Sequence, residues 1–206
     1  MRTLLTAAFF AAASCVIAER EPPVSGPPGG GAFVVPPGTR VAYGSEVTTP
    51  VSEYLEWAAT FEPGKTSASN QYLVEGLDRL RKALRALETT VPDLRDELAR
   101  RLGRMELEAG RILAGGPTDQ TRAAWVRDAL TASLDVLEEI AHDRAAADPA
   151  LADALRELRA AVDDIQPDEP LSDQLGALTT FFRATVATMA SLANVVPPPA
   201  ERRPGG

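Results

Sequence analysis

Two stretches of the chain carry apolar residues at alternating intervals of four and three positions, a spacing that matches the turn of an α-helix. The first stretch consists of Leu73, Leu77, Leu80, Leu84 and Leu87, and the second of Leu151, Leu155, Leu158, Val162 and Ile165. The spacing puts each set of side chains on one stripe along its helix. Because such a stripe leaves water only when other helices cover it, the pattern predicts a bundle of packed helices.

Residues that favour helix starts divide positions 48–196 into one short helix followed by five long ones. The expected starts are Thr49-Pro50, a cap within 66–69, Pro92-Asp93, Thr118-Asp119, Asp148-Pro149, and Ser172 or Asp173. The loops between these segments are short, which favours antiparallel neighbours. We therefore expect an all-α fold, a single antiparallel bundle of about five long helices plus one short N-terminal helix.

The last of these helices differs from the others in its lack of charge. Between Gln174 and Val196 the only charged residue is Arg183, and the rest of the segment is rich in Leu, Phe, Val and Ala. A helix that is apolar on most sides is buried on most sides. Its threonines and Arg183 make it too polar for a membrane span, so we expect it to be the central helix of the bundle.

The N-terminal residues have the pattern of an export signal. Arg2 is followed by an uncharged segment, 3–14, that is rich in Leu, Phe and Ala and too short to span a bilayer. Small residues before Glu19 fit cleavage after Ala18, which makes 1–18 a signal peptide. We expect the protein to be exported, either to the periplasm or to a membrane surface.

A second processing site lies within the same segment. Ala12-Ala13-Ser14-Cys15 resembles a bacterial lipobox, although that pattern favours Leu where this chain has Ala12. Processing there makes 1–14 a lipoprotein signal and leaves a lipidated Cys15 as the new N-terminus. Cys15 is the chain's only cysteine, so we expect membrane attachment through a lipid at Cys15, with a freely soluble exported protein as the alternative.

Proline and glycine dominate the segment after the signal and the end of the chain. Residues 19–47 contain repeated Pro-Pro and Gly-Gly pairs, and residues 197–206 are again rich in proline. Prolines lack the amide donor, and glycines lose much backbone entropy when they are ordered. We expect 19–47 to be a disordered linker, 48–196 to be the bundle domain, and 197–206 to be a disordered tail.

The net charge of −8 argues against nucleic-acid binding, which depends on neutralising phosphates with basic side chains. The acidic character is concentrated in positions 118–173, which contain fourteen acidic residues and five arginines. We interpret this as a solvated acidic surface. Weak divalent-cation binding at Asp163-Asp164 and Asp168-Glu169 is the alternative, although the spacing matches no calcium loop.

No catalytic, metal or cofactor motif is complete in this chain. Gly64-Lys65-Thr66 has the ending of a phosphate-binding loop but lacks its upstream glycine and strand. His142 is the only histidine, and Glu139 precedes it by three positions, whereas a di-metal bundle needs two such pairs. We expect neither a cofactor nor a catalytic site.

Four aromatic residues form the candidate functional site that the sequence suggests. Tyr54, Trp57 and Phe61 share one side of the first helix, and Tyr72 lies at the start of the second. One interpretation is that they fasten the first helix to the bundle. The other is that they form a patch for a partner or ligand next to the linker.

These observations favour a non-enzymatic protein that acts through contact with a protein partner or with the cell envelope. The alternative is a bundle that holds a small ligand or metal between its helices, for which we expect a cavity lined by the last helix and Arg183. An enzyme that uses carboxylates is the least favoured reading, because no spacing in the sequence points to a catalytic pair.

Overall fold

The computed structural model describes residues 43–115 and 118–195, and within these ranges it contains seven α-helices and no strand. The helices are α1 (Ser45–Ala59), α2 (Pro63–Ala68), α3 (Asn70–Glu88), α4 (Arg95–Ala114), α5 (Asp119–Ala147), α6 (Pro149–Asp163) and α7 (Leu175–Ala193). Short 3-10 turns at Pro92–Leu94 and Leu171–Gln174 precede α4 and α7. The predicted all-α fold is confirmed. The predictions for the signal, Cys15, most of the linker and the tail lie outside the described residues.

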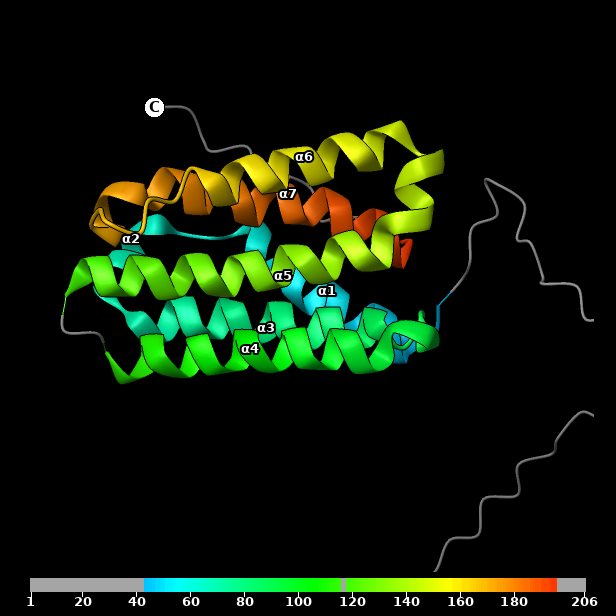
Figure 1. The fold of residues 1–206 in the computed structure, drawn as a ribbon, viewed down its shortest axis with the longest axis horizontal. Coiled ribbons are helices and arrows are strands. Elements are labelled where there is room, and N and C mark those ends of the chain that lie inside the picture. The colour runs from blue at the N-terminus through cyan, green and yellow to red at the C-terminus, as the bar shows by residue number, and fades with distance from the viewer. Residues whose placement is uncertain (1–42, 116–117, 196–206) are drawn as a thin grey trace, which may run out of the picture. The chain divides into compact units, whose positions relative to one another are not determined.

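The six longer helices form a closed ring of packed neighbours. From α3 to α7 each helix packs against the next, and both α7 and α3 pack against α1. Neighbours in the ring run in opposite directions, with α4 along the lower edge of Figure 1, α5 across the middle and α6 along the upper edge. The short α2 packs against α3 and α7. The chain therefore forms the expected antiparallel bundle.

The interior of the ring is built from the two stripes that the sequence indicated. All ten residues of the two stripes are buried, with Ile165 just beyond the end of α6, and they belong to one hydrophobic core with side chains from every long helix. Three helix starts also match. The side chains of Ser69, Thr118 and Asp148 each accept a hydrogen bond from a backbone N–H in the following turn.

The first helix begins earlier than Thr49-Pro50, the predicted start. It begins at Ser45, so Pro50 lies inside it. Proline removes one intrahelical hydrogen bond at that position. The longer helix buries Val47 together with Val51, one turn later on the same face, which offsets the lost bond. The residues after it, 63–68, form α2, a helix that the sequence pattern did not predict.

The prediction that the last helix is central was wrong. α7 is a member of the ring, between α6 and α1, and it exposes Gly176, Thr180, Arg183, Ala187 and Ser191 along one face. Apart from Arg183 these residues are small and uncharged, so the face carries a single charge without being strongly apolar. By length and composition the segment Leu171–Ala193 also passes as a membrane span. Its large apolar side chains, however, are the ones buried in the bundle.

Candidate functional site

The structure brings the four predicted aromatic residues together, and it places most of them inside the bundle. Tyr54, Trp57 and Phe61 are buried, and Tyr72 is half-buried. Phe182 of α7 completes the cluster, with its ring centroid 5.0 Å from that of Trp57 and 4.7 Å from that of Phe61. Three of the four predicted rings therefore offer no surface to a partner, and the packing interpretation accounts for them.

One buried hydrogen bond joins this cluster to α7. The hydroxyl groups of Tyr54 and Thr185 lie 2.5 Å apart, and Thr185 also donates to the carbonyl of Phe182 at 2.7 Å. Thr185 has one proton to donate, so the Tyr54 hydroxyl is the donor between the two. Burial raises the pKa of the Tyr54 phenol well above its usual range, which keeps this donor protonated.

Replacing Tyr54 with phenylalanine is expected to lower the free energy of unfolding by about 0.5–1.5 kcal/mol, because the change removes a buried donor and leaves the ring in place. Urea unfolding measures the loss. Tyr72→Phe is the matched control, since the Tyr72 hydroxyl accepts a bond from the Glu62 amide at an exposed position. If Tyr72→Phe lowers the free energy of unfolding as much as Tyr54→Phe does, the assignment of the Tyr54 hydroxyl as a stabilising buried donor is contradicted.

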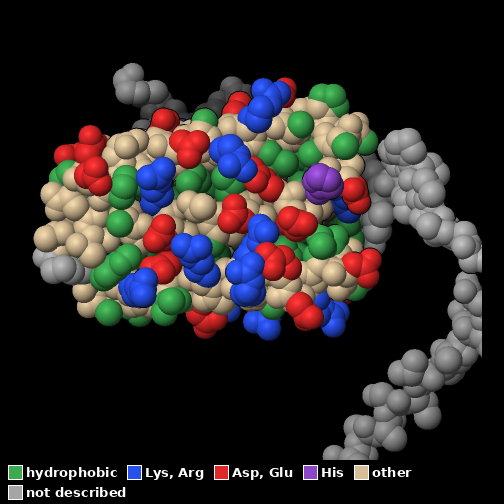
Figure 2. Space-filling view, in the orientation of Figure 1, with side chains coloured by type: hydrophobic (Ala, Val, Ile, Leu, Met, Phe, Trp, Pro, Cys, Tyr) green, Lys and Arg blue, Asp and Glu red, His purple; other side chains and the backbone are tan. Residues whose placement is uncertain are grey.

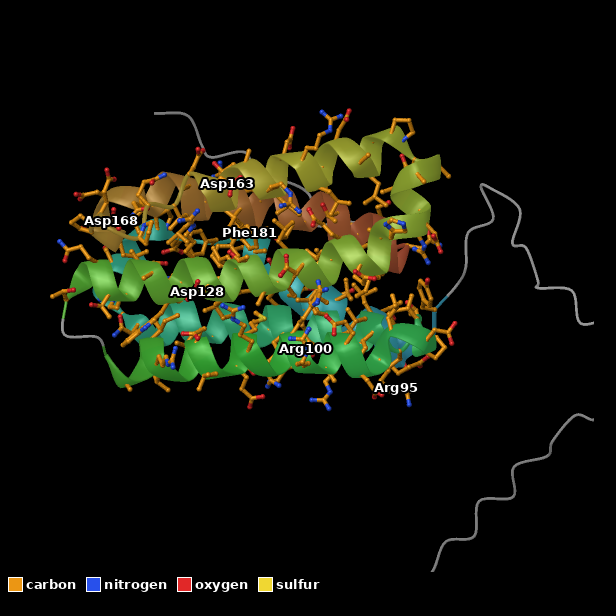
Figure 3. The ribbon with its side chains drawn as sticks, viewed as in Figure 1. Arg95, Arg100, Asp128, Asp163, Asp168 and Phe181 are labelled. Atoms are coloured by element: carbon orange, nitrogen blue, oxygen red, sulfur yellow. The ribbon has the colours of Figure 1, made fainter. Side chains whose placement is uncertain are left out.

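The residues considered for metal or phosphate chemistry are not gathered into one site. His142 is exposed on α5, and Glu139 lies 4.0 Å from Arg101 of α4. Gly64-Lys65-Thr66 lies within α2, where Lys65 pairs with Glu62 at 3.0 Å. Figure 3 shows Asp163 at the end of α6 and Asp168 in the loop that follows. Across the ranges with described side chains, no three His, Cys, Asp or Glu residues are grouped to hold a metal ion.

The outward surface of α4 is the part of the described bundle where large apolar side chains meet solvent. Leu107 is 55% exposed and Leu113 is 56% exposed. Leu107 lies on a stripe with Gly103, Gly110 and Ala114, opposite the buried side of the helix. We call Gly103, Leu107, Gly110 and Ala114 the α4 stripe. Hydrophobic side chains gather over this part of α4 at the lower left of Figure 2, while charged ones line the edge to the right.

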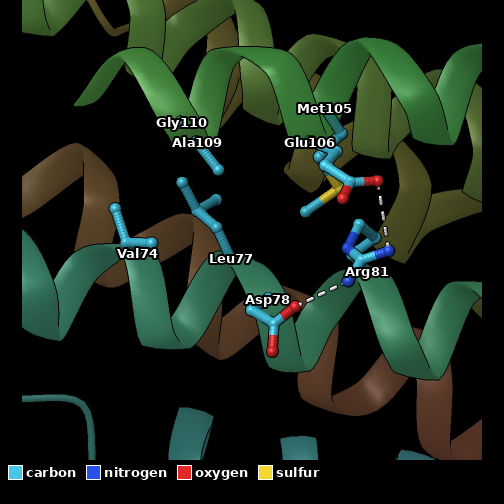
Figure 4. A pocket seen from close by; sticks show the side chains of 8 residues that line it. All are labelled: Val74, Leu77, Asp78, Arg81, Met105, Glu106, Ala109 and Gly110. Carbon is cyan, nitrogen blue, oxygen red and sulfur yellow. Dashed lines mark hydrogen bonds and ion pairs between the residues drawn. The ribbon is translucent and has the colours of Figure 1, made fainter. Parts of the chain in front are cut away.

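Two hollows run along α4 and share Glu106 and Gly110. The larger is a shallow surface hollow of about 510 Å³, lined by Gly103, Glu106, Leu107, Gly110, Arg111 and Ala114. The smaller, about 200 Å³, lies between α3 and α4 and has Leu77 and Met105 among its lining residues (Figure 4). Small-molecule pockets usually measure about 300–1,000 Å³. Arg183 lines neither hollow, so the cavity expected beside the last helix is not one of these two.

The two glycines of the α4 stripe have no packing role inside the described bundle. A Cβ atom added at Gly103 or Gly110 meets nothing within 4 Å. At Gly76 of α3, by contrast, such an atom lies 2.0 Å from the indole of Trp57. A glycine inside a helix costs about 0.5–1 kcal/mol relative to alanine. Packing against Trp57 explains that cost at Gly76. At Gly103 and Gly110 no neighbouring side chain requires a glycine, and the lack of a side chain leaves the helix backbone open to solvent.

Alanine at Gly103 or Gly110 is accordingly expected to raise the free energy of unfolding of the monomer, by about 0.5–1 kcal/mol for each substitution. Alanine loses less backbone entropy than glycine when the helix forms, and the new methyl group has open space. Thermal or urea unfolding at low protein concentration measures the gain. A loss of stability at either position means that the added methyl group meets part of the chain.

Charged side chains lie on both sides of the α4 stripe. On the side facing α3, Arg81 bonds Asp78 at 2.8 Å and Glu106 at 3.4 Å (Figure 4). Partial burial alone raises the pKa of Asp78, but hydrogen bonds from Lys82 and Arg81 outweigh it, and the pKa is lowered. On the other side, Arg111 binds the buried carboxylate of Glu108 at 2.9 Å.

The lowered pKa of Asp78 predicts a pH dependence of stability. A carboxyl whose folded pKa is below its unfolded value stabilises the fold above the unfolded pKa, and this contribution is lost as the pH falls through the folded pKa. Asp78→Asn is expected to cost less than about 1 kcal/mol at pH 7, because the pair is partly exposed. Urea unfolding at low pH is expected to show a smaller difference in the free energy of unfolding between the parent protein and Asp78→Asn. A difference that does not change with pH contradicts the pairing of Asp78 with Lys82 and Arg81.

The apolar spacing of α4 in the sequence indicates which side of the helix is buried, and it does not indicate the α4 stripe on the opposite side. Leu98, Leu102, Met105 and Ile112 form the buried apolar side of this helix. Leu107 lies off that buried side, between two glycines that a surface helix does not need, and this combination is the signal that the sequence offers for the stripe.

Comparisons with protein-family models, with curated proteins and with solved structures find no match to the chain.

Proposed function

We propose that this chain is an exported, lipid-tethered, non-enzymatic helical-bundle protein that acts by binding another protein through the outer surface of α4. One observation carries the proposal. The two exposed leucines of the described bundle, Leu107 and Leu113, both lie on α4, and Leu107 lines a shallow hollow of about 510 Å³ on this helix. Exposed apolar side chains gathered in one place, with charged residues around them, are typical of protein contact surfaces.

The chemistry around the leucines suits a helix as the bound element. A stripe of small residues with one leucine forms a shallow groove along α4, and Glu106 and Arg111 flank it with opposite charges. Helical partners bind such grooves through apolar anchors spaced by three or four residues. The flanking charges then set the partner's orientation more than its affinity.

The N-terminal sequence supports export and tethering. It combines an uncharged, Leu- and Ala-rich segment with a lipobox-like Ala12-Ala13-Ser14-Cys15. A single acyl chain gives only reversible membrane binding, so two or more chains at Cys15 are needed for a stable anchor. Mass spectrometry of the mature N-terminus tests this part. An acylated Cys15 supports the tether, and an unmodified N-terminus at Glu19 rules it out.

Photo-crosslinking in intact cells tests the contact surface. A photoreactive phenylalanine analogue at position 107 or 113 is expected to give protein adducts that mass spectrometry identifies. The same analogue at Ser67 or Glu157, which are exposed on α2 and α6, is the matched control. Adducts specific to the α4 positions support the proposal. It is contradicted if all four positions give the same adducts, or if none gives a protein adduct.

A further inference from the structure

We infer that the protein bound at the α4 stripe is a second copy of this chain, whose α4 packs in parallel and in register against the first. This inference rests on the proposed function, since it identifies the partner for the same surface. The contact is isologous, so the same residues of both copies meet across a two-fold axis. The two helix axes run side by side along that axis.

The shape of the stripe fits such a pair. In an in-register parallel pair, Leu107 faces Leu107 of the other copy, while Gly103, Gly110 and Ala114 lie above and below it. The small residues allow the two backbones to approach closely, as helix pairs with small residues at the contact do. This gives Gly103 and Gly110 a packing role, which they lack within the described bundle because no atom fills the space above them.

The charges beside the stripe select the parallel direction. Glu106 lies on one side of the stripe, and Arg104 and Arg111 lie on the other. In a parallel pair opposite sides meet, and Glu106 faces Arg111 of the other copy, five positions later, as ion pairs across parallel coiled coils do. In an antiparallel pair like sides meet, which brings Arg104 and Arg111 of one copy toward those of the other at a cost in repulsion.

The contact is short and weak. The stripe from Gly103 to Ala114 extends about 18 Å along the helix, so the buried area falls at the low end for specific interfaces. Arg100 continues the stripe toward the start of α4, where its copies repel each other, so the helices cross near Leu107 and diverge from there. Tethering both copies to one membrane raises their effective concentration, which allows a weak pair to form.

Sedimentation equilibrium of the purified mature chain tests the inference. The protein is expected to show a reversible monomer–dimer equilibrium below about 1 mM. The double variant Gly103→Ala/Gly110→Ala is expected to weaken dimerisation at least about tenfold while its monomer unfolds at a higher temperature. Gly176→Ala is the matched control, because Gly176 is an exposed helical glycine of α7 with open space above it. A wild-type protein that is monomeric at every concentration overturns the inference.

Disulfide trapping tests the direction of the pair. In a Cys15→Ser background, Leu107→Cys and Ala114→Cys are each expected to form dimers on mild oxidation, because in a parallel pair each position meets its own copy. In an antiparallel pair centred on Leu107, position 114 lies about 20 Å from its copy. Trapping at 107 without trapping at 114 therefore overturns the parallel arrangement. Ser191→Cys, exposed on α7, is the control that stays monomeric.

Failure of this inference and failure of the proposed function give different results. If the protein is monomeric and position 107 crosslinks to a different envelope protein, the inference that the partner is a second copy is overturned. The proposal that the α4 surface is a contact site then still stands. A monomeric protein without α4-specific adducts overturns both. Adducts between two copies of this chain in cells, together with a reversible dimer in solution, support both.

Discussion

Replacing Phe182 with alanine is expected to lower the free energy of unfolding by about 3–5 kcal/mol, the largest single effect that the fold implies. Phe182 of α7 is fully buried. Its ring contacts Trp57 of α1 and Phe61, which follows the end of α1, and packs edge-on against Phe181, with centroids 4.7–5.5 Å away. Truncation leaves a cavity where α1 and α7 meet, and the surrounding rings fill it only in part.

The matched control for this prediction is Phe182→Leu. Leucine keeps most of the apolar volume, so its expected cost is below about 1.5 kcal/mol. Equilibrium unfolding in urea, with both variants measured beside the parent protein, gives the comparison. An alanine variant that loses less than about 1 kcal/mol contradicts the placement of this ring in the core.

The second large effect is expected at Gly76, where alanine destabilises a helix that it normally favours. An added Cβ lies 2.0 Å from the nearest ring atom of Trp57 and under 3 Å from two others. The indole is buried among Phe61, Tyr72 and Phe182, so it has little room to move. The gain in helix propensity is about 1 kcal/mol, and overpacking typically costs about 1–3 kcal/mol or more, so we expect a net loss.

A double-mutant cycle separates this clash from other causes. In the presence of Trp57→Phe, whose smaller ring withdraws from α3, the cost of Gly76→Ala is expected to shrink by about 1 kcal/mol or more. Gly110→Ala is expected to have the opposite sign from Gly76→Ala, since both are helical glycines and only one faces a side chain. Equal effects at the two glycines contradict the account of both helices.

Much of the fold follows from local patterns that depend on few residues. The leucine stripes of α3 and α6 specify which side is buried, because a helix with one apolar stripe has one way to cover it. Ser69, Thr118 and Asp148 mark helix starts, because their side chains satisfy backbone amides that otherwise lack partners. These signals need no knowledge of the neighbouring helices.

The errors arose where tertiary packing outweighs local preference. Pro50 marks a helix start by its own chemistry, yet burial of Val47 extends α1 past it. The sequence of α7 predicts burial on most sides because it contains few charged residues. Gly, Ala, Ser and Thr are uncharged but are equally compatible with solvent, so a lack of charge does not by itself indicate burial. Arg183, on the exposed side of α7, marked that side in the sequence.

The candidate site was harder to predict than the fold. Aromatic side chains favour both cores and interfaces, so the sequence alone does not separate a packing role from a contact role for Tyr54, Trp57 and Phe61. For Trp57, the close approach of its indole to Gly76 of α3 shows that the side chain packs in the core. This contact between two helices is visible only in the structure. The exposure of Leu107 likewise depends on which neighbours α4 has in the ring.

Radical footprinting of Leu107 and Leu113 tests most directly the claim that α4 carries the contact surface. Oxidation of these side chains is compared between intact cells and the dilute purified protein, with exposed His142 of α5 as the internal reference. We expect oxidation of Leu107 to fall several-fold in cells relative to His142, because a bound protein excludes water from the stripe. Equal reactivity of Leu107 in both settings contradicts the claim.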